Sequence, residues 1–260
     1  MKLAVQENLV PGQTFYQKVE LLADMGYEGV ELSGGGLTTR ISEIRDALKE
    51  NGVAAASVCG GIKFGLLYPS REDREETVSQ IEQLLAAAAE VGAQGMIVAP
   101  IFGPPQLPDM TPWKTARELE EELLVEQLGR LAAYAGKHGV KVFVEPLNRY
   151  ETHLLNRVEE AVAINQRVAS PHLKVLADLF HMNIEETDIP AAIHAGGANI
   201  GYVHLADSNR VAPGMGHTNF RSAFAALREV SYKGWMSLEC RVPHGEQSLR
   251  ETIRFMKSQM

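Results

Sequence analysis

The 260-residue sequence contains only two cysteines, Cys59 and Cys240. This excludes a disulfide scaffold and favours a reducing compartment. No apolar run approaches the roughly 20 residues that a membrane-spanning helix needs. Gln6 and Glu7 interrupt the N-terminal segment where a signal peptide would continue its apolar core. We therefore expect a cytoplasmic protein that does not act on membranes.

The sequence also lacks an excess of basic charge. It has 25 Lys and Arg against 33 Asp and Glu, giving a formal net charge of −8. Nucleic acid is disfavoured as a partner, because its binding depends on basic patches. The glycine clusters at Gly34–Gly36 and around Gly60 have neither P-loop nor dinucleotide-binding spacing. No nucleotide cofactor is expected.

Strand-like and helix-like runs alternate along the whole sequence. The expected strands are Lys2–Gln6, Gly29–Leu32, Val53–Ser57, Met96–Ala99 and the runs that end at Glu145, Asp178, His204 and Glu239. The expected helices are about Thr14–Met25, Ile41–Asn51, Glu72–Val91, Thr115–His138, Glu159–Val168, Ile189–Ala195, Phe220–Val230 and Gln247–Lys257. Regular alternation indicates a parallel sheet, and eight units in about 250 residues are typical of a closed barrel. The sequence predicts one (β/α)8 TIM barrel of the α/β class, a single domain over residues 1–260.

Four candidate metal ligands fall at the ends of the last four predicted strands. They are Glu145 in KVFVE, Asp178 in KVLAD, His204 in GYVHL and Glu239 in WMSLE. Singly, each has an ordinary explanation, such as a solvated strand end, a helix N-cap or a core histidine. Because the C-terminal ends of barrel strands meet at one mouth, together they predict one cavity. Three carboxylates and one imidazole suit a divalent metal ion.

Further polar residues follow in the predicted loops at this mouth. Glu151 lies six residues after Glu145, His181 three after Asp178, and Arg210 six after His204. Arg210 has an alternative explanation as a surface residue, but arginine is well suited to hold an anionic oxygen. The segment PIFGPPQLPDMTPW, after the fourth predicted strand, contains five prolines and is expected to be a loop.

Four strings resemble a known family: EPLNRYETHLLN, ADLFHMNIEE, HLADSNRVAPGMGH and LEC. They are similar to the sugar epimerases of the xylose isomerase-like barrel superfamily. The nearest group is D-tagatose 3-epimerase, with the D-psicose 3-epimerases and 5-keto-L-gluconate epimerases. The resemblance is densest across Glu145–Cys240 and is weak but compatible in the first half. The early loops QENLVPGQ and CGGIKFGLLYPS have no identifiable match in the tagatose or psicose enzymes. The substrate therefore stays open among free ketoses, keto-aldonates and sugar phosphates.

The resemblance implies roles for the candidate residues. It assigns metal ligation to Glu145, Asp178, His204 and Glu239, and makes the two glutamates the acid and base as well. Glu151, His181 and Arg210 match positions that bind substrate. One divalent ion is expected, Mn²⁺ first, with Mg²⁺ or Co²⁺ as alternatives and Zn²⁺ left open. The partners implied are a small sugar or keto-sugar acid and further copies of the chain, in a dimer or tetramer.

These residues suit epimerisation of the C3 type, next to a carbonyl group. One carboxylate removes the proton and another returns one to the opposite face. A divalent cation stabilises the enediolate that forms between the two steps. Related chemistry on the same scaffold stays open, namely an aldose–ketose or hydroxypyruvate-type isomerase, or a keto-sugar or keto-inositol dehydratase. More distant alternatives are a multi-zinc abasic-site endonuclease, which the net charge opposes, and a barrel that binds sugar without catalysis.

Overall fold

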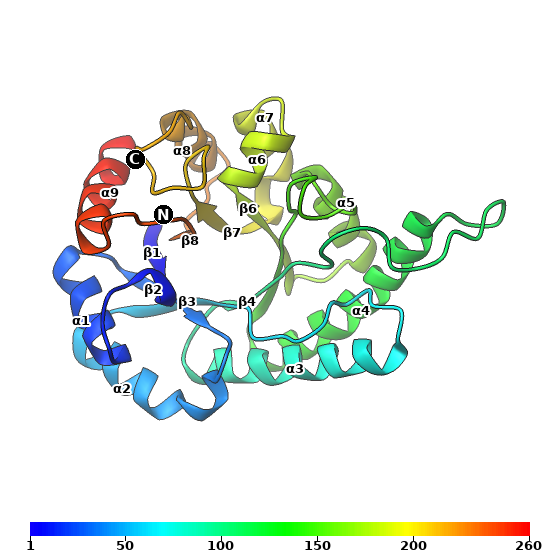
Figure 1. Ribbon diagram of the computed structural model, residues 1–260, viewed down its shortest axis with the longest axis horizontal. Helices are drawn as coiled ribbons and strands as arrows, with labels where there is room; N and C mark the ends of the chain where they lie inside the picture. The colour runs from blue at the N-terminus through cyan, green and yellow to red at the C-terminus, as the bar shows by residue number, and fades with distance from the viewer.

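The computed structural model describes all 260 residues, and its eight parallel strands close into a barrel in the order β1 to β8 (Figure 1). The strands are β1 Lys2–Gln6, β2 Gly29–Ser33, β3 Ala54–Cys59, β4 Gly95–Val98, β5 Lys141–Val144, β6 Leu173–Asp178, β7 Ile200–Leu205 and β8 Trp235–Leu238. The helices are α1 Phe15–Met25, α2 Ile41–Asn51, α3 Arg71–Glu90, α4 Ala116–His138, α5 Val158–Val168, α6 Leu179–Glu185, α7 Ile189–Gly196, α8 Phe220–Glu229 and α9 Glu246–Gln259. The predicted TIM barrel is confirmed.

The sequence predicts eight helices, and the structure has a ninth, α6. This helix follows β6 without a loop, because Asp178 ends the strand and also caps the helix. The Asp178 carboxylate accepts a hydrogen bond from the Phe180 N–H at 2.7 Å. Seven residues are too few to show a helical period in the sequence. The prediction of a loop in this place was wrong.

Side chains that point into the barrel form a compact apolar layer. Its members are Ala4, Ala56, Ile97, Phe143, Leu176, Tyr202 and Trp235. Phe143 and Tyr202 are fully buried, with their ring centroids 5.2 Å apart. Gly29 makes room for Trp235, because a Cβ at this position would lie 2.6 Å from the indole ring. The barrel is thus filled below its C-terminal end.

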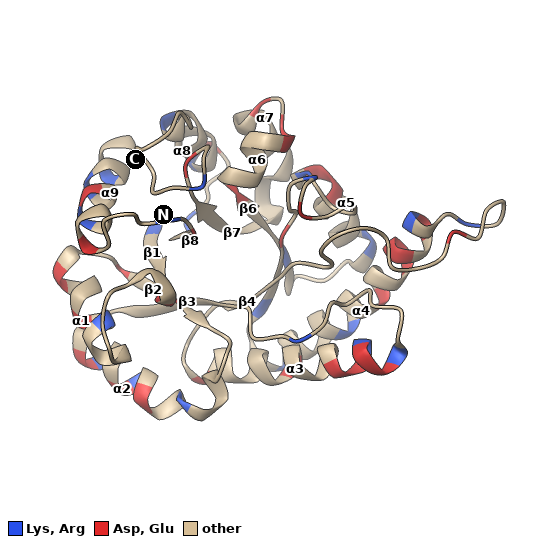
Figure 2. Cartoon of the chain, in the orientation of Figure 1, with Lys and Arg blue, Asp and Glu red and all other residues tan.

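A second, larger apolar core lies between the barrel and the ring of helices, and contains 67 buried residues. The helices expose acidic and basic side chains interspersed with one another (Figure 2). None of them combines the length and apolar character needed to cross a bilayer.

The proline-rich segment after β4 is a loop, as expected. It projects from the body of the barrel beyond α4 (Figure 1). The buried Glu120 carboxylate holds its base, accepting hydrogen bonds from the Gln106 N–H at 2.6 Å and the Leu107 N–H at 3.2 Å. His153 contacts the same carboxylate at 2.5 Å. At the root of this loop, Phe102 stands next to the mouth of the barrel with 63% of its surface exposed.

Candidate metal centre

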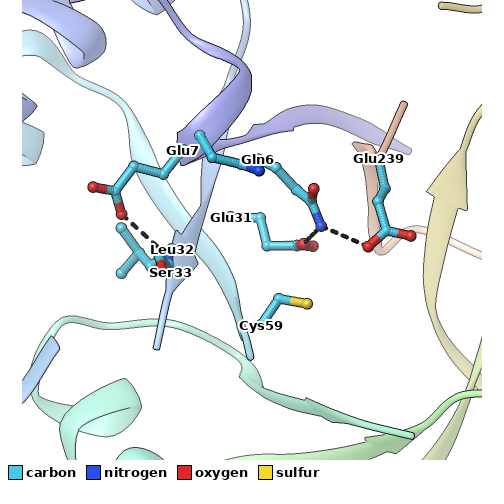
Figure 3. Close-up of a pocket in the computed structure, with 8 residues that line it drawn as sticks. Gln6, Glu7, Glu31, Leu32, Ser33, Cys59 and Glu239 are labelled. Carbon is cyan, nitrogen blue, oxygen red and sulfur yellow. Dashed lines mark hydrogen bonds between the residues drawn. The ribbon is translucent and has the colours of Figure 1, made fainter. Parts of the chain in front are cut away.

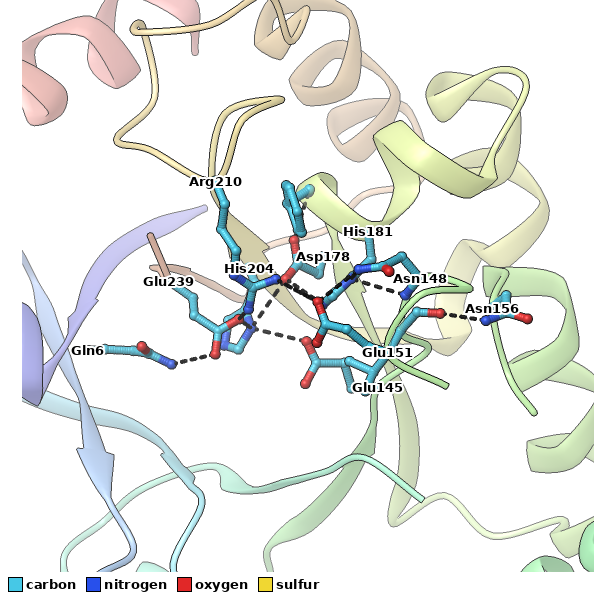
Figure 4. A network of polar contacts seen from close by, with 12 residues as sticks. Gln6, Glu145, Asn148, Glu151, Asn156, Asp178, His181, His204, Arg210 and Glu239 are labelled. Atoms are coloured by element: carbon cyan, nitrogen blue, oxygen red, sulfur yellow. Dashed lines mark hydrogen bonds and ion pairs between the residues drawn. The ribbon is translucent and has the colours of Figure 1, made fainter. Parts of the chain in front are cut away.

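Residues two positions beyond the apolar layer also point inward, because side chains alternate along a strand. This places Glu145 above Phe143, Asp178 above Leu176 and His204 above Tyr202. Glu145, Asp178, His204 and Glu239 each present one ligand atom, and these four atoms lie within 4.8 Å of one another. Figure 4 shows them converging from β5, β6, β7 and β8. The convergence predicted from the sequence is confirmed, and the four residues form a possible metal site.

Three buried atoms in this cluster have no hydrogen-bond partner: Glu145 Oε1, Asp178 Oδ2 and His204 Nδ1. The Nδ1 atom lies 3.4 Å from Glu145 Oε1, 3.9 Å from Asp178 Oδ2 and 3.3 Å from Glu239 Oε2. Leaving a buried polar atom unpartnered costs about 1–3 kcal/mol. Atoms that face one another without partners therefore fit a shared divalent cation, which carboxylate and imidazole ligands suit.

The surroundings move the pKa values of the carboxyl groups in opposite directions. Burial raises the pKa of Glu145, and burial with the charge of Glu239 raises the pKa of Asp178 to about 6. Burial alone would raise the pKa of Glu239 as well, but the charges of His204 and Arg210 lower it to about 2. A cation bound among these groups would favour all their ionised forms.

Two buried residues of this layer, Gln6 and Glu31, were missed in the sequence analysis. They are paired neighbours on β1 and β2. The Glu31 carboxylate oxygens lie 3.0 and 3.2 Å from His204 Nε2. The Gln6 amide donates to Glu31 at 2.8 Å and to Glu239 at 2.9 Å (Figure 3). The available signal was a charge inside the apolar run GVEL, since a buried charge needs a partner.

His181 is buried beside the cluster, on α6. The backbone N–H of Asn148 donates to its Nδ1 at 3.1 Å, so the neutral ring carries its hydrogen on Nε2. Burial lowers the pKa of His181, which favours this neutral form. Nε2 lies 3.6 Å from Asp178 Oδ2 and 3.3 Å from an Arg210 nitrogen. The geometry presents one imidazole N–H donor at the edge of the site.

Arg210 reaches the site from the loop after β7. Its guanidinium donates to Glu239 Oε2 at 3.0 Å and lies over the ring of Phe180, 4.7 Å from the centroid. The backbone of Arg210 has a left-handed φ of 58°, uncommon for a residue other than glycine. Such a conformation persists where the surrounding structure enforces it.

Asp207 holds the loop that imposes this backbone conformation on Arg210. Its buried carboxylate accepts hydrogen bonds from the N–H groups of Ser208 at 2.8 Å, Gly214 at 2.8 Å and Thr218 at 2.9 Å. Gly216 passes so close that a Cβ would lie 2.4 Å from Asp207 Oδ1. One carboxylate therefore organises the loop that carries Arg210.

Glu151, the third expected substrate-binding residue, lies farther out at the mouth. It accepts a hydrogen bond from the Asn148 side chain at 2.9 Å and stands 3.7 Å from an Arg210 nitrogen. Asn148 links Glu151 to His181, since its side-chain nitrogen is 2.8 Å from His181 Nδ1. Asn148 was not among the predicted site residues.

Two cavities open on either side of Glu239 and Cys59. The first, of about 260 Å³, is mainly polar and is lined by Gln6, Glu7, Asn8, Glu31, Leu32, Ser33, Cys59 and Glu239 (Figure 3). The second, of about 250 Å³, contains Glu145, Glu151, His181 and Arg210 together with the apolar Ile62, Ile97, Phe102 and Leu147. All three expected substrate-binding residues thus line one cavity with two of the four candidate ligands.

None of the remaining histidines belongs to this group of candidate ligands. His172 contacts the Val140 carbonyl oxygen at 2.9 Å, and His194 pairs with Glu229 on the outer helices. The structure brings together a single group of candidate ligands, the four residues above. This is fewer than the multi-zinc alternative requires.

The chain belongs to the xylose isomerase-like TIM barrel family, whose model matches residues 19–259. A 3-dehydro-D-guloside 4-epimerase of Escherichia coli K12 is 31% identical over 99% of this chain and all of its own length. A solved structure of an E. coli 3-keto-D-glucoside 4-epimerase is 30% identical, covers 99% of both chains and superposes with a TM-score of 0.91.

Ketose epimerases match a shorter part of the chain. A D-psicose 3-epimerase of Enterocloster bolteae is 39% identical over 46% of this chain and 40% of its own length. Together these relatives make the protein an enzyme of the sugar epimerase class.

Proposed function

We propose that this enzyme inverts the carbon next to the carbonyl group of a keto-sugar. The observation that carries the proposal is the convergence of Glu145 and Glu239 with Asp178 and His204 at the open end of the barrel. Figure 4 shows the two glutamates approaching the centre of the site from different sides. Two such carboxylates suit a proton transfer that leaves by one face and returns by the other.

The relatives support this chemistry at either of two carbons. In a 3-dehydro sugar the carbonyl is carbon 3, so a 4-epimerase acts on its neighbour, and in psicose the carbonyl is carbon 2, so a 3-epimerase does the same. The match over the whole chain is to the 4-epimerase, whereas the psicose enzyme matches less than half. We therefore propose carbon 4 of a 3-keto-hexoside as the centre inverted, and the C3-type reaction on a ketose as the second candidate.

The residues of the chain supply most of the necessary groups. One glutamate accepts the proton from the carbon and the other donates a proton to the opposite face. The His181 Nε2–H and the Arg210 guanidinium donate hydrogen bonds to the substrate oxygen that gains negative charge. A divalent cation held by Glu145, Asp178, His204 and Glu239 would supply Lewis-acid stabilisation of that charge.

Deuterium incorporation tests the reaction. The enzyme is incubated with Mn²⁺ in deuterated water with 3-keto-glucosides and with free ketoses, and products are followed by NMR. We expect label at carbon 4 of the inverted 3-keto-glucoside. Label at carbon 3 of an inverted ketose would favour the second candidate. An aldose product labelled at the carbon next to its carbonyl group would indicate an isomerase, and a product that has lost water would indicate a dehydratase. Either result would contradict an epimerase.

Replacement of Arg210 by Ala is expected to lower kcat/KM by about 10²–10³, the usual loss of one well-placed donor to a developing oxyanion. The variant lacks the guanidinium that donates hydrogen bonds to the substrate oxygen and to Glu239. Steady-state kinetics on the substrate found by NMR measures the loss. Arg149→Ala is the matched control, because Arg149 stands at the same mouth but pairs with Glu185 and lines neither cavity. Equal kinetics for the two variants would remove Arg210 from the mechanism.

A further inference from the structure

The site contains a buried carboxylate that the four candidate ligands do not include. Glu31 has 1% of its surface exposed, and His204 is fully buried. Both Glu31 oxygens face His204 Nε2, at 3.0 and 3.2 Å. An ionised carboxylate only accepts hydrogen bonds, so the hydrogen of the imidazole that faces Glu31 must be on Nε2.

This arrangement leaves the other ring nitrogen for the centre of the site. His204 Nδ1 has no hydrogen-bond partner and lies 3.3 Å from Glu239 Oε2 and 3.4 Å from Glu145 Oε1. An imidazole ligates a metal ion in its neutral form, through the nitrogen that lacks a hydrogen, so a bound cation would take the place of the Nδ1 hydrogen that the charged His204 ring carries. Glu31 thus selects Nδ1 as the ligand atom and holds the ring in the orientation that points this atom at the site.

Gln6 joins Glu31 to a second ligand. One amide nitrogen of Gln6 donates to Glu31 Oε1 at 2.8 Å and to Glu239 Oε1 at 2.9 Å. The other Glu239 oxygen accepts from Arg210 at 3.0 Å. A neutral donor shared by two carboxylates reduces their repulsion and holds both in place.

We propose that Glu31 and Gln6 are positioning residues of the metal centre. Glu31 sets the tautomer and basicity of His204 and adds a negative charge next to the metal site. Gln6 fixes the position of Glu239 by a hydrogen bond and is itself held by Glu31. The proposal rests on the proposed function, because it presumes that the four ligands bind a divalent cation. Partners of this kind typically change metal affinity by 10–100-fold.

The test is Mn²⁺ binding to the purified metal-free chain, measured by calorimetry without substrate. Glu31→Gln keeps the shape and an oxygen that accepts from His204, but removes the charge, and we expect its Kd for Mn²⁺ to rise about 10–100-fold. Gln6→Leu should also weaken binding, and Glu31→Asp should restore part of the affinity. Glu43→Gln, at an exposed position on α2, is the matched control and should leave the Kd unchanged.

The melting temperature of the metal-free variants separates positioning from a merely structural role. A structural role would lower it and leave Mn²⁺ affinity unchanged, whereas a positioning role lowers the Mn²⁺ affinity itself, whether or not the metal-free Glu31→Gln chain melts lower after His204 loses its buried partner. A Glu31→Gln variant with Mn²⁺ affinity within twofold of the unaltered chain would overturn the proposal.

A second test uses no variant and therefore does not depend on how a variant folds. It is NMR of the unaltered, ¹⁵N-histidine-labelled chain loaded with Zn²⁺. We expect a hydrogen on His204 Nε2 and a metal-shifted Nδ1; a hydrogen on Nδ1 would overturn the proposal. If the unaltered chain bound none of Mn²⁺, Mg²⁺, Co²⁺ and Zn²⁺, the metal centre of the proposed function would itself fail. The two failures are therefore distinguishable.

Discussion

Replacement of Glu145 or Glu239 by Gln is expected to lower turnover by about 10²–10⁴, the usual contribution of a positioned acid or base. Each change keeps the shape of the side chain but removes a proton-transferring carboxylate. The barrel should stay folded, because both residues lie beyond the apolar layer of its interior. Kinetics, with melting temperature and metal content measured on the same samples, checks the result.

The two variants also differ in a way that only a two-base mechanism predicts. With one carboxylate left, an epimer whose proton faces it can still exchange that proton for deuterium without inverting. We expect Glu145→Gln and Glu239→Gln, each loaded with metal, to exchange opposite epimers. Glu159→Gln, exposed on α5, is the control and should behave as the unaltered enzyme. Residual turnover above a tenth of the original in either variant would contradict the mechanism.

Removal of divalent metal is expected to abolish turnover, and readdition should restore it. Binding to the folded state alone stabilises it by about 2.7 kcal/mol when the free ion is at 100 times its Kd. In a chain of this size this raises the melting temperature by about 5–11 °C. Exhaustive chelation, metal analysis and thermal melts with Mn²⁺, Mg²⁺, Co²⁺ and Zn²⁺ measure both effects.

His204→Ala supplies the control for metal removal, because it deletes the only nitrogen ligand of the group. The variant should retain less metal after dialysis and gain little thermal stability from added Mn²⁺. Full turnover of the chelated enzyme, with no metal detected, would contradict a metal-dependent reaction.

The barrel and the four candidate ligands were predictable because both depend on local patterns. Apolar runs reveal buried strands, and the topology places all their C-terminal ends together. This sufficed to bring Glu145, Asp178, His204 and Glu239 to one point, although they are far apart in the sequence. The manganese ion and the dimer or tetramer remain predictions, which metal content and mass in solution would test.

Other parts of the site depend on contacts that no local pattern records. Glu31 and Gln6 lie in the first half of the chain, where the resemblance to the ketose epimerases is weak, and the role proposed for them follows from distances to His204 and Glu239. The link from Glu151 through Asn148 to His181 likewise depends on the way two separate loops pack. The helix α6 was not predicted because it has only seven residues and follows β6 directly, with Asp178 as both the last strand residue and the helix cap.

The apolar layer inside the barrel has a consequence for the order in which substrate and product bind. Phe143, Tyr202 and Trp235 fill the barrel below the site, so a sugar can reach it only from the C-terminal end, where both cavities open. Each sugar must depart along the route by which it arrived before the next can enter. Both epimers therefore compete for the same entrance, and accumulated product should inhibit competitively from either direction.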